Sequence, residues 1–187
     1  MTRIIGGTAG GRRLRTPSGA LTRPTSDRVR EALFSALESA LGSLVGLRFL
    51  DLYAGSGAVG LEAASRGAAA VTLVEQDRRT AGLIRQNVQD LGLPGVQVVQ
   101  GSVSHHLGPH GPSTEPYDAV FLDPPYERAP ASVVEDLRAL TGGWLAPEAL
   151  VVVERSRRTA PVEWPAGYVA ARSRAYGETV LWFGTWR

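Results

Sequence analysis

The fold is decided by the stretch FLDLYAGSGAVG, residues 49–60. An apolar strand is predicted over residues 47–52, and it leads through a glycine turn into a helix predicted over residues 57–66. Glycine suits this turn because the chain bends sharply and because a ligand can approach a backbone that carries no Cβ. The spacing G-x-G-x-x-G also occurs in dinucleotide-binding enzymes and is weak on its own; here it is met by Gly55, Gly57 and Gly60.

Two carboxylates make this pattern more specific. Asp51 stands four residues before the first glycine, where a carboxylate can engage a cationic amino-acid group but would repel the pyrophosphate of a dinucleotide. Glu75 follows Gly55 by twenty residues, at the end of a strand predicted over residues 70–74, and can accept hydrogen bonds from both ribose hydroxyls of an adenosine. The alternatives are that Asp51 only caps the glycine turn and that Glu75 is an exposed acid. Asp77 is expected to N-cap the next helix.

Strands and helices alternate through most of the chain, which predicts an α/β fold with a doubly wound, mostly parallel sheet and right-handed crossovers. A first helix, N-capped by Thr25 or Ser26, is expected before the glycine turn. Residues 101–115 are predicted to form a surface loop. The last two strands alternate around a Tyr-Gly turn, as in an antiparallel hairpin. The further strands are predicted at residues 96–99, 117–122, 150–153, 168–173 and 178–186, and further helices at 81–91 and 133–140.

The most specific motif is DAVFLDPPY, residues 118–126. Its two prolines, Pro124 and Pro125, fix the backbone and remove amide donors, so that carbonyl oxygens are left as acceptors. The carboxylate of Asp123 and the carbonyl of Pro124 can both accept from a planar exocyclic amino group. This draws the nitrogen toward a pyramidal geometry and frees its lone pair for a methyl group. Tyr126 offers a face on which an extruded base can stack. A rigid proline turn with an incidental tyrosine is the alternative.

Positive charge gathers at the beginning of the chain. The formal net charge is +2, but residues 1–30 carry +6 and the remainder carries −4. A basic arm on a mildly acidic body indicates a polyanionic partner, and its lack of aromatic residues favours contacts with a nucleic-acid backbone. Residues 3–15 are expected to form two short strands around a glycine-rich turn that project from the body, with a disordered tail as the alternative. The candidate contacts with such a backbone are Arg3, Arg12, Arg13, Arg15, Arg23, Arg28 and Arg30.

Several classes of protein and site are excluded by composition. The chain has no cysteine, so it has no disulfide and no thiolate site. No apolar run is long enough for a membrane span and the first residues do not read as a signal peptide, so a cytoplasmic protein is expected. His105, His106 and His110 do not have metal-site spacing; they are expected to be solvated, and no metal is predicted. The four tryptophans are expected to pack in the core or at its edge.

Together, these motifs resemble those of class I S-adenosylmethionine-dependent methyltransferases that modify amino groups. A narrower resemblance lies in RIIGGTAGGR, residues 3–12, and RPTSDRVREALF, residues 23–34. With these stretches, nearly the whole chain is similar to the bacterial 16S rRNA guanine-N2-methyltransferase family. The resemblance implies a Rossmann-like sheet of seven strands with an antiparallel last hairpin. It also implies a hairpin arm over residues 1–20 and a methyltransferase domain over residues 21–187.

The resemblance further implies the cofactor and the partner. S-adenosylmethionine would lie over the glycine turn, and the partner would be 16S rRNA, within a small-subunit particle or an assembly intermediate. Nothing in the sequence demands more than a monomer. Ser102 stands where many relatives carry Asp, so weaker adenine contacts are expected. Cofactor contacts are expected at Asp51, Tyr53, Ala54, Gly55, Gly57, Glu75, Gln76, Ser102 and Val103.

Two other functions stay open at this point. A DNA amino-methyltransferase acting on adenine N6 or cytosine N4 would use the same Asp-Pro-Pro-Tyr chemistry. Such enzymes usually carry a separate target-recognition region, for which this chain has only the arm and residues 101–115. A non-catalytic RNA-binding assembly factor on a methyltransferase scaffold is the second alternative, and the intact Asp123 and Glu75 speak against it.

Overall fold

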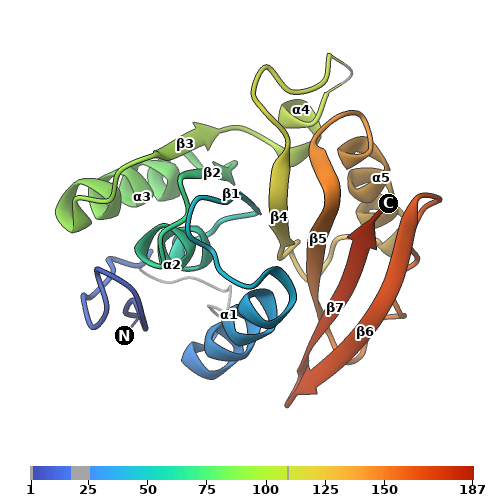
Figure 1. Cartoon of the computed structure of the whole chain (residues 1–187), viewed down its shortest axis with the longest axis horizontal. Helices are drawn as coiled ribbons and strands as arrows, with labels where there is room; N and C mark the ends of the chain where they lie inside the picture. Colours follow the sequence, from blue (N-terminus) through green and yellow to red (C-terminus); the bar gives the residue numbers. More distant parts are fainter. Residues whose placement is uncertain (1, 18–25, 109) are drawn as a thin grey trace.

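A computed structural model describes residues 2–17, 26–108 and 110–187. Within these residues seven strands form one sheet with helices on both faces (Figure 1). The helices are α1 (Asp27–Leu41), α2 (Ala58–Ser65), α3 (Arg78–Leu91), α4 (Val103–His106) and α5 (Pro130–Leu140). The strands are β1 (Arg48–Leu52), β2 (Ala70–Glu75), β3 (Val96–Gln100), β4 (Tyr117–Leu122), β5 (Leu145–Ser156), β6 (Tyr168–Tyr176) and β7 (Thr179–Trp186).

The strand order is β3-β2-β1-β4-β5-β7-β6. β1 pairs in parallel with β2 on one side and with β4 on the other, and β7 lies antiparallel between β5 and β6. The predicted parallel sheet and antiparallel last hairpin are therefore confirmed. The chain order reverses between β1 and β4, which is where open α/β sheets bind ligands at the carboxyl ends of their strands.

Alternation along the strands divides the core into two layers. Phe49, Leu73 and Phe121 pack with α1, α2 and α3, whereas Leu50 and Leu122 pack on the other face with α4 and α5. Each residue of the first set is followed two positions later by an acid, at the end of β1, β2 or β4. Because side chains two residues apart share a face, these acids belong to the α2 side of the sheet. The core thus gathers the predicted carboxylates at one sheet edge and on one face.

Three local predictions are wrong. β5 begins at Leu145 rather than at residue 150, and its first part is irregular because Glu148 takes a φ of 62°. Residues 101–115 include the short helix α4, which the Ser102 side chain caps by accepting from the backbone N of His105. His106 is half-buried, 4.9 Å from the Trp144 ring between centroids, and burial followed by the charge of His105 lowers its pKa. It is therefore not a solvated loop histidine.

The helix caps follow the sequence more closely. The Ser26 side chain accepts from the backbone N of Val29 and caps α1, and the Asp77 side chain accepts from the backbone N of Thr80 and caps α3. Both confirm the predicted N-caps. The tryptophans pack in or against the core, as expected. Among the described residues, no helix is long and apolar enough to cross a membrane.

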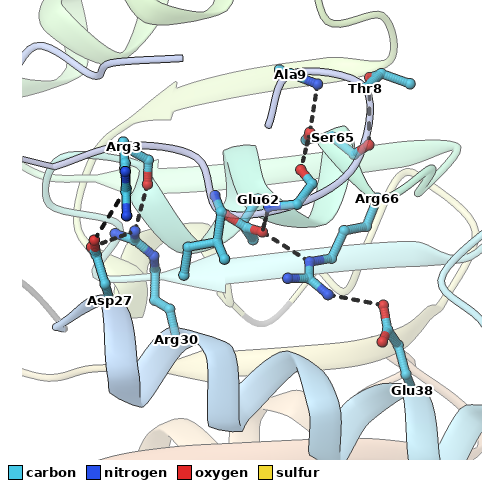
Figure 2. A network of polar contacts seen from close by, with 11 residues as sticks. Arg3, Thr8, Ala9, Asp27, Arg30, Glu38, Glu62, Ser65 and Arg66 are labelled. Carbon is cyan, nitrogen blue, oxygen red and sulfur yellow. Dashed lines mark hydrogen bonds and ion pairs between the residues drawn. The ribbon is translucent and has the colours of Figure 1, made fainter. Parts of the chain in front are cut away.

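The N-terminal segment forms the predicted hairpin, but it does not project. Arg3 and Arg13 pair as an antiparallel bridge, and Ile4 and Leu14 are buried in the core layer beside α2. The backbone N atoms of Ile5 and Gly6 donate to the fully buried carboxylate of Glu62 in α2, at 2.7 and 2.8 Å (Figure 2). The projecting arm is therefore a wrong prediction, because its apolar side chains and amide donors are satisfied only on the body.

The hairpin is also tied to the start of α1. Arg30 is fully buried, and its guanidinium donates to the carbonyl oxygen of Arg3 and to the carboxylate of Asp27 (Figure 2). Desolvation lowers its pKa, although Asp27 and Glu62 oppose this shift. A side chain without exposed surface cannot contact RNA, so Arg30 is corrected from a candidate RNA contact to a structural residue. Arg23 and the proposed domain boundary at residue 20 lie outside the described residues.

Candidate active site

The glycine turn after β1 is held by two carboxylates, and the first is Asp51. Its side chain is buried, and Oδ2 accepts from the backbone N of Gly60 at 2.8 Å. Desolvation raises the pKa of Asp51 to about 7, opposed by the Gly60 hydrogen bond and reinforced by the charge of Glu75. Asp51 therefore fastens the start of α2 through one of its two carboxylate oxygens.

Glu75, at the end of β2, is the second carboxylate. Its Oε2 accepts from the backbone N of Gly55 at 2.8 Å, and its Oε1 accepts from the backbone N of Asp77 at 2.8 Å. The side chain is partly exposed. Because an ionised carboxylate has about four lone-pair sites, both oxygens can still accept from ribose hydroxyls. The structure thus brings Asp51, the glycine turn and Glu75 together, as the spacing predicted.

The glycines of the turn have different reasons to be glycine. Gly55 has a φ of 57°, and a Cβ built there meets only the carbonyl oxygen of Tyr53, at 4.0 Å. Gly57 also has a positive φ, of 80°, but a Cβ there would in addition lie 2.9 Å from Cγ2 of Ile84. Gly57 therefore allows α2 to pack on α3, whereas the backbone at Gly55 faces open space that a ligand can enter. A glycine turn between two carboxylates fits the aminoacyl and ribose groups of S-adenosylmethionine.

The remaining candidate cofactor residues contribute less side-chain chemistry. Gln76 is exposed, and its carbonyl oxygen accepts from the side-chain amide of Gln100 at 3.1 Å. The Ser102 hydroxyl accepts from the backbone N of His105 at 3.2 Å and lies 3.3 Å from the Ser104 hydroxyl, so at most one acceptor lone pair is left for an adenine amino group. The Val103 side chain is buried in the core, so only its backbone can face a ligand.

The Asp-Pro-Pro-Tyr loop follows β4, beside the glycine turn. Asp123 is joined to β1 through its backbone N, which lies 3.4 Å from the carbonyl oxygen of Leu52. Burial, followed by the nearby carboxylates of Glu154 and Asp51, raises the pKa of Asp123, and Arg155 opposes the shift. Tyr126 is 65% exposed, which leaves its side chain accessible for stacking.

The prolines leave one acceptor of this loop open. The carbonyl oxygen of Pro125 accepts from the backbone N of Arg128 at 2.9 Å, which closes a turn. In the described part of the chain, no donor contacts the carbonyl oxygen of Pro124. Asp123 and Pro124 thus offer a carboxylate and a carbonyl as acceptors at one point of the sheet edge.

Sequence reasoning missed a polar cluster behind this loop. The Tyr53 hydroxyl donates to the carboxylate of Asp136 in α5, and Nη2 of Arg128 donates to the same carboxylate at 3.1 Å. Nη2 of Arg155 donates to the carbonyl oxygen of Arg128 at 2.9 Å. One signal was present in the sequence. Asp136 stands on the apolar face of α5, between Val133 and Leu140, where an acid needs partners.

Comparison with known proteins bears on this arrangement. A family model described as Conserved hypothetical protein 95 matches residues 2–185. The chain belongs to this family. It is 38% identical to Ribosomal RNA small subunit methyltransferase D of Escherichia coli over 180 residues, which cover 94% of this chain and 85% of the relative. The protein of the same name from Haemophilus influenzae is 35% identical, over 94% of this chain and 89% of its own length.

Solved structures agree over the whole chain. An Escherichia coli protein superposes with a TM-score of 0.86 and 35% identity, covering 99% of this chain and 97% of its own. A Thermus thermophilus protein superposes with a TM-score of 0.82 and 37% identity, with 98% of each chain covered. The predicted class I methyltransferase fold of this chain is therefore confirmed.

Proposed function

We propose that this protein transfers a methyl group from S-adenosylmethionine to the exocyclic N2 of a guanine in small-subunit rRNA. The observation that carries the proposal is the pair of acceptors at Asp123 and Pro124, placed beside the Asp51–Glu75 glycine turn at the reversal of strand order. The names of the Escherichia coli and Haemophilus influenzae relatives support rRNA methylation. The choice of guanine N2 rests on the resemblance of the N-terminal motifs.

The residues of the glycine turn fit the cofactor by their chemistry. Asp51 holds the ammonium group, Glu75 accepts from the ribose hydroxyls, and the backbone at Gly55 and Gly57 leaves room for the aminoacyl chain. Ser102 and Val103 face the adenine. Further contacts come from Tyr53, Ala54 and Gln76. When bound, S-adenosylmethionine supplies an electrophilic methyl group and leaves as a neutral thioether.

In the transfer, the Asp123 carboxylate and the Pro124 carbonyl accept hydrogen bonds from the two N–H groups of the target amino group. The nitrogen lone pair is thereby turned toward the electrophilic methyl group that bound S-adenosylmethionine would supply, with the neutral thioether as the leaving group. Asp123 then takes the proton that the nitrogen loses. Burial raises the pKa of Asp123, which makes it a stronger proton acceptor than an exposed acid. Pro125 stiffens the loop, and Tyr126 stacks on the extruded base.

The experiment that tests the proposal is deletion of the gene, followed by mass spectrometry of nucleosides from small-subunit rRNA. N2-methylguanosine is expected to fall by one residue per subunit and to return when the gene is restored. Purified protein with labelled cofactor is expected to label the same rRNA. Labelled N6-methyladenosine or N4-methylcytosine would favour the DNA-type alternative, and no transfer to any acceptor would favour the non-catalytic scaffold.

The cofactor site gives a direct prediction for Glu75. Glu75→Ala removes an acceptor for the ribose and also the partner of the Gly55 amide. A charge-assisted hydrogen bond contributes about 1.5–3 kcal/mol, and 1.4 kcal/mol is about tenfold in affinity. The Kd for S-adenosylmethionine, measured by calorimetry, is therefore expected to rise at least about tenfold. Glu75→Gln keeps one acceptor oxygen, so its Kd is expected to lie between those of the original protein and Glu75→Ala. An unchanged Kd in Glu75→Ala contradicts the assignment.

Asp51 predicts a pH dependence of cofactor binding. Because its pKa is raised to about 7, its carboxylate loses charge as the pH falls through 7, and the cofactor ammonium loses its partner. The Kd for S-adenosylmethionine is expected to rise by up to about tenfold per pH unit below that pKa, so about tenfold between pH 8 and 6. Asp51→Asn is expected to bind more weakly at pH 8 and to lose this part of the pH dependence. If the Kd depends on pH equally in Asp51→Asn and in the original protein, Asp51 does not bind the cofactor ammonium group.

The RNA contacts are proposed for exposed arginines of the hairpin and of α1. Arg3, Arg13 and Arg28 are exposed, and Arg3 makes only a long ion pair, at 3.7 Å, with Asp27. Arg12 and Arg15 are exposed too, but Arg12 donates to the backbone oxygen of Asp90 and Arg15 pairs with its carboxylate at 2.9 Å. We therefore expect the first three to contribute more to phosphate binding.

A triple variant tests this. Changing Arg3, Arg13 and Arg28 to Gln removes three charges, so the slope of log affinity for single-stranded rRNA against log salt is expected to fall by about 2. The matched control changes three other exposed arginines to Gln, and its slope is expected to stay close to that of the original protein. Equal slopes for the two triple variants contradict a specific role of the hairpin. The control positions are Arg85, Arg138 and Arg187.

A further inference from the structure

The polar cluster behind the Asp-Pro-Pro-Tyr loop joins the two halves of the site. Tyr53 directly follows β1 and begins the glycine turn, and Arg128 follows Tyr126 by two residues. Both side chains donate to one carboxylate, that of Asp136, which is 4% exposed. The Arg128 guanidinium also lies 5.4 Å from the centroid of the Tyr53 ring. Asp136 is therefore the shared acceptor between the cofactor side and the base side.

The backbone at Tyr53 is held in a strained conformation by these contacts. Its φ is 63°, in the left-handed region that a residue with a bulky side chain rarely adopts. Such a conformation persists only where the surroundings fix it. The hydroxyl of Tyr53 is anchored in α5, and burial followed by the Asp136 carboxylate raises its pKa, so it stays protonated and donates.

The arginine side of the cluster is fixed as firmly. Arg155 in β5 is buried, and its Nη2 donates to the backbone oxygen of Arg128. Its charge also acts on Asp123. This series of contacts, from β5 through Arg128 to α5, therefore fixes the backbone that directly follows Tyr126. A buried ion pair is weak evidence of a gain in stability, because apolar replacements are often as stable, so the cluster needs another explanation.

We propose that Asp136 is a positioning residue: through Tyr53 and Arg128 it holds the cofactor turn and the Asp-Pro-Pro-Tyr loop in one mutual geometry. Transfer requires the nitrogen and the methyl carbon at about 3–3.5 Å, and an error of about 1 Å costs on the order of 100-fold in rate. This inference rests on the proposed function only where the test measures turnover. The coupling of the loop to cofactor binding does not depend on which base is methylated.

The test compares Asp136→Asn and Tyr53→Phe with a matched control. Tyr53→Phe removes one hydroxyl and keeps the ring, so it is expected to fold even if Asp136→Asn does not. The control is Tyr168→Phe, which removes a hydroxyl that donates to the backbone oxygen of Leu137 in the same helix at 2.7 Å but does not reach the site. The variants are full-length proteins.

The first measurement is hydrogen exchange with and without S-adenosylmethionine. In the original protein and in Tyr168→Phe, cofactor binding is expected to slow exchange at Ala54 and at Arg128, whose amides bond to the oxygens of Val74 and Pro125. In Asp136→Asn and Tyr53→Phe the slowing is expected at Ala54 but not at Arg128. Equal protection of Arg128 in all four proteins overturns the proposal, whether or not rRNA is the substrate.

The second measurement separates kcat from KM. Both variants are expected to lower kcat at least about tenfold while the KM for the cofactor changes less than about threefold. The double variant is expected to be no worse than either single variant, because both break one chain of contacts. A role in stability alone predicts lower melting temperatures with unchanged kcat at low temperature, and that result overturns the proposal. If the original protein does not methylate rRNA, the proposed function fails and hydrogen exchange still decides the coupling.

Discussion

Asp123→Ala is expected to lower kcat for methyl transfer by about 100-fold or more, since removing one well-placed polar group from an active site typically costs about 10²–10³ in rate. The variant loses the acceptor that orients the target amino group and the base that takes its proton. The Kd for S-adenosylmethionine is expected to change less than about threefold, because the glycine turn is fastened by other carboxylates. The measurement is single-turnover transfer to rRNA beside calorimetry with the cofactor.

Two controls sharpen this result. Asp123→Asn keeps one acceptor oxygen but no base, so its kcat is expected to lie between the alanine variant and the original protein. Glu127→Gln removes an exposed carboxylate from the same loop and is expected to leave kcat unchanged. Near-native turnover in Asp123→Ala contradicts the amino-methylation mechanism, and an equal loss in Glu127→Gln indicates a general effect of charge on this loop.

The glycine turn and its carboxylates could be predicted because they depend on local sequence signals and on the regular pairing of parallel strands. The bend before α2 requires glycine within a few residues, and the parallel strands place the ends of β1, β2 and β4 side by side whatever the side chains are. Asp51, Glu75 and Asp123 therefore come to one edge from spacing alone. The same reasoning found the caps at Ser26 and Asp77, which depend on contacts three residues away.

The missed features depend on contacts between distant parts of the chain. Composition marks Arg30 as one more basic residue of the arm, and only the packing of the hairpin on α1 and α2 shows that it is buried. Asp136 similarly meets Tyr53, a partner 83 residues away in sequence. Charge patterns describe segments, whereas the role of a charged side chain depends on the element that covers it.

The second prediction with a large expected effect concerns the N-terminal hairpin that packs on α1 and α2. Deleting residues 2–15 is expected to unfold the protein or to lower its melting temperature severely. Ile4 and Leu14 are buried, and burial of a large aliphatic side chain contributes about 1.5–3 kcal/mol. Glu62 would also lose two backbone donors while staying partly buried, which costs about 1–3 kcal/mol or more for a charged group. The sum approaches the whole stability of a typical domain, about 5–15 kcal/mol.

The deletion is also expected to impair cofactor binding, although it removes no residue of the glycine turn. Glu62 lies in α2, the helix that follows the turn and is fastened to Asp51 through Gly60. Thermal unfolding followed by circular dichroism, with and without cofactor, measures both effects. Arg13→Gln, which alters an exposed charge of the same hairpin and keeps its backbone, is the matched control and is expected to melt within about 2 °C of the original protein, as surface substitutions usually do. A deletion variant with an unchanged melting temperature and an unchanged Kd for S-adenosylmethionine contradicts this prediction, because the hairpin would then be a dispensable arm.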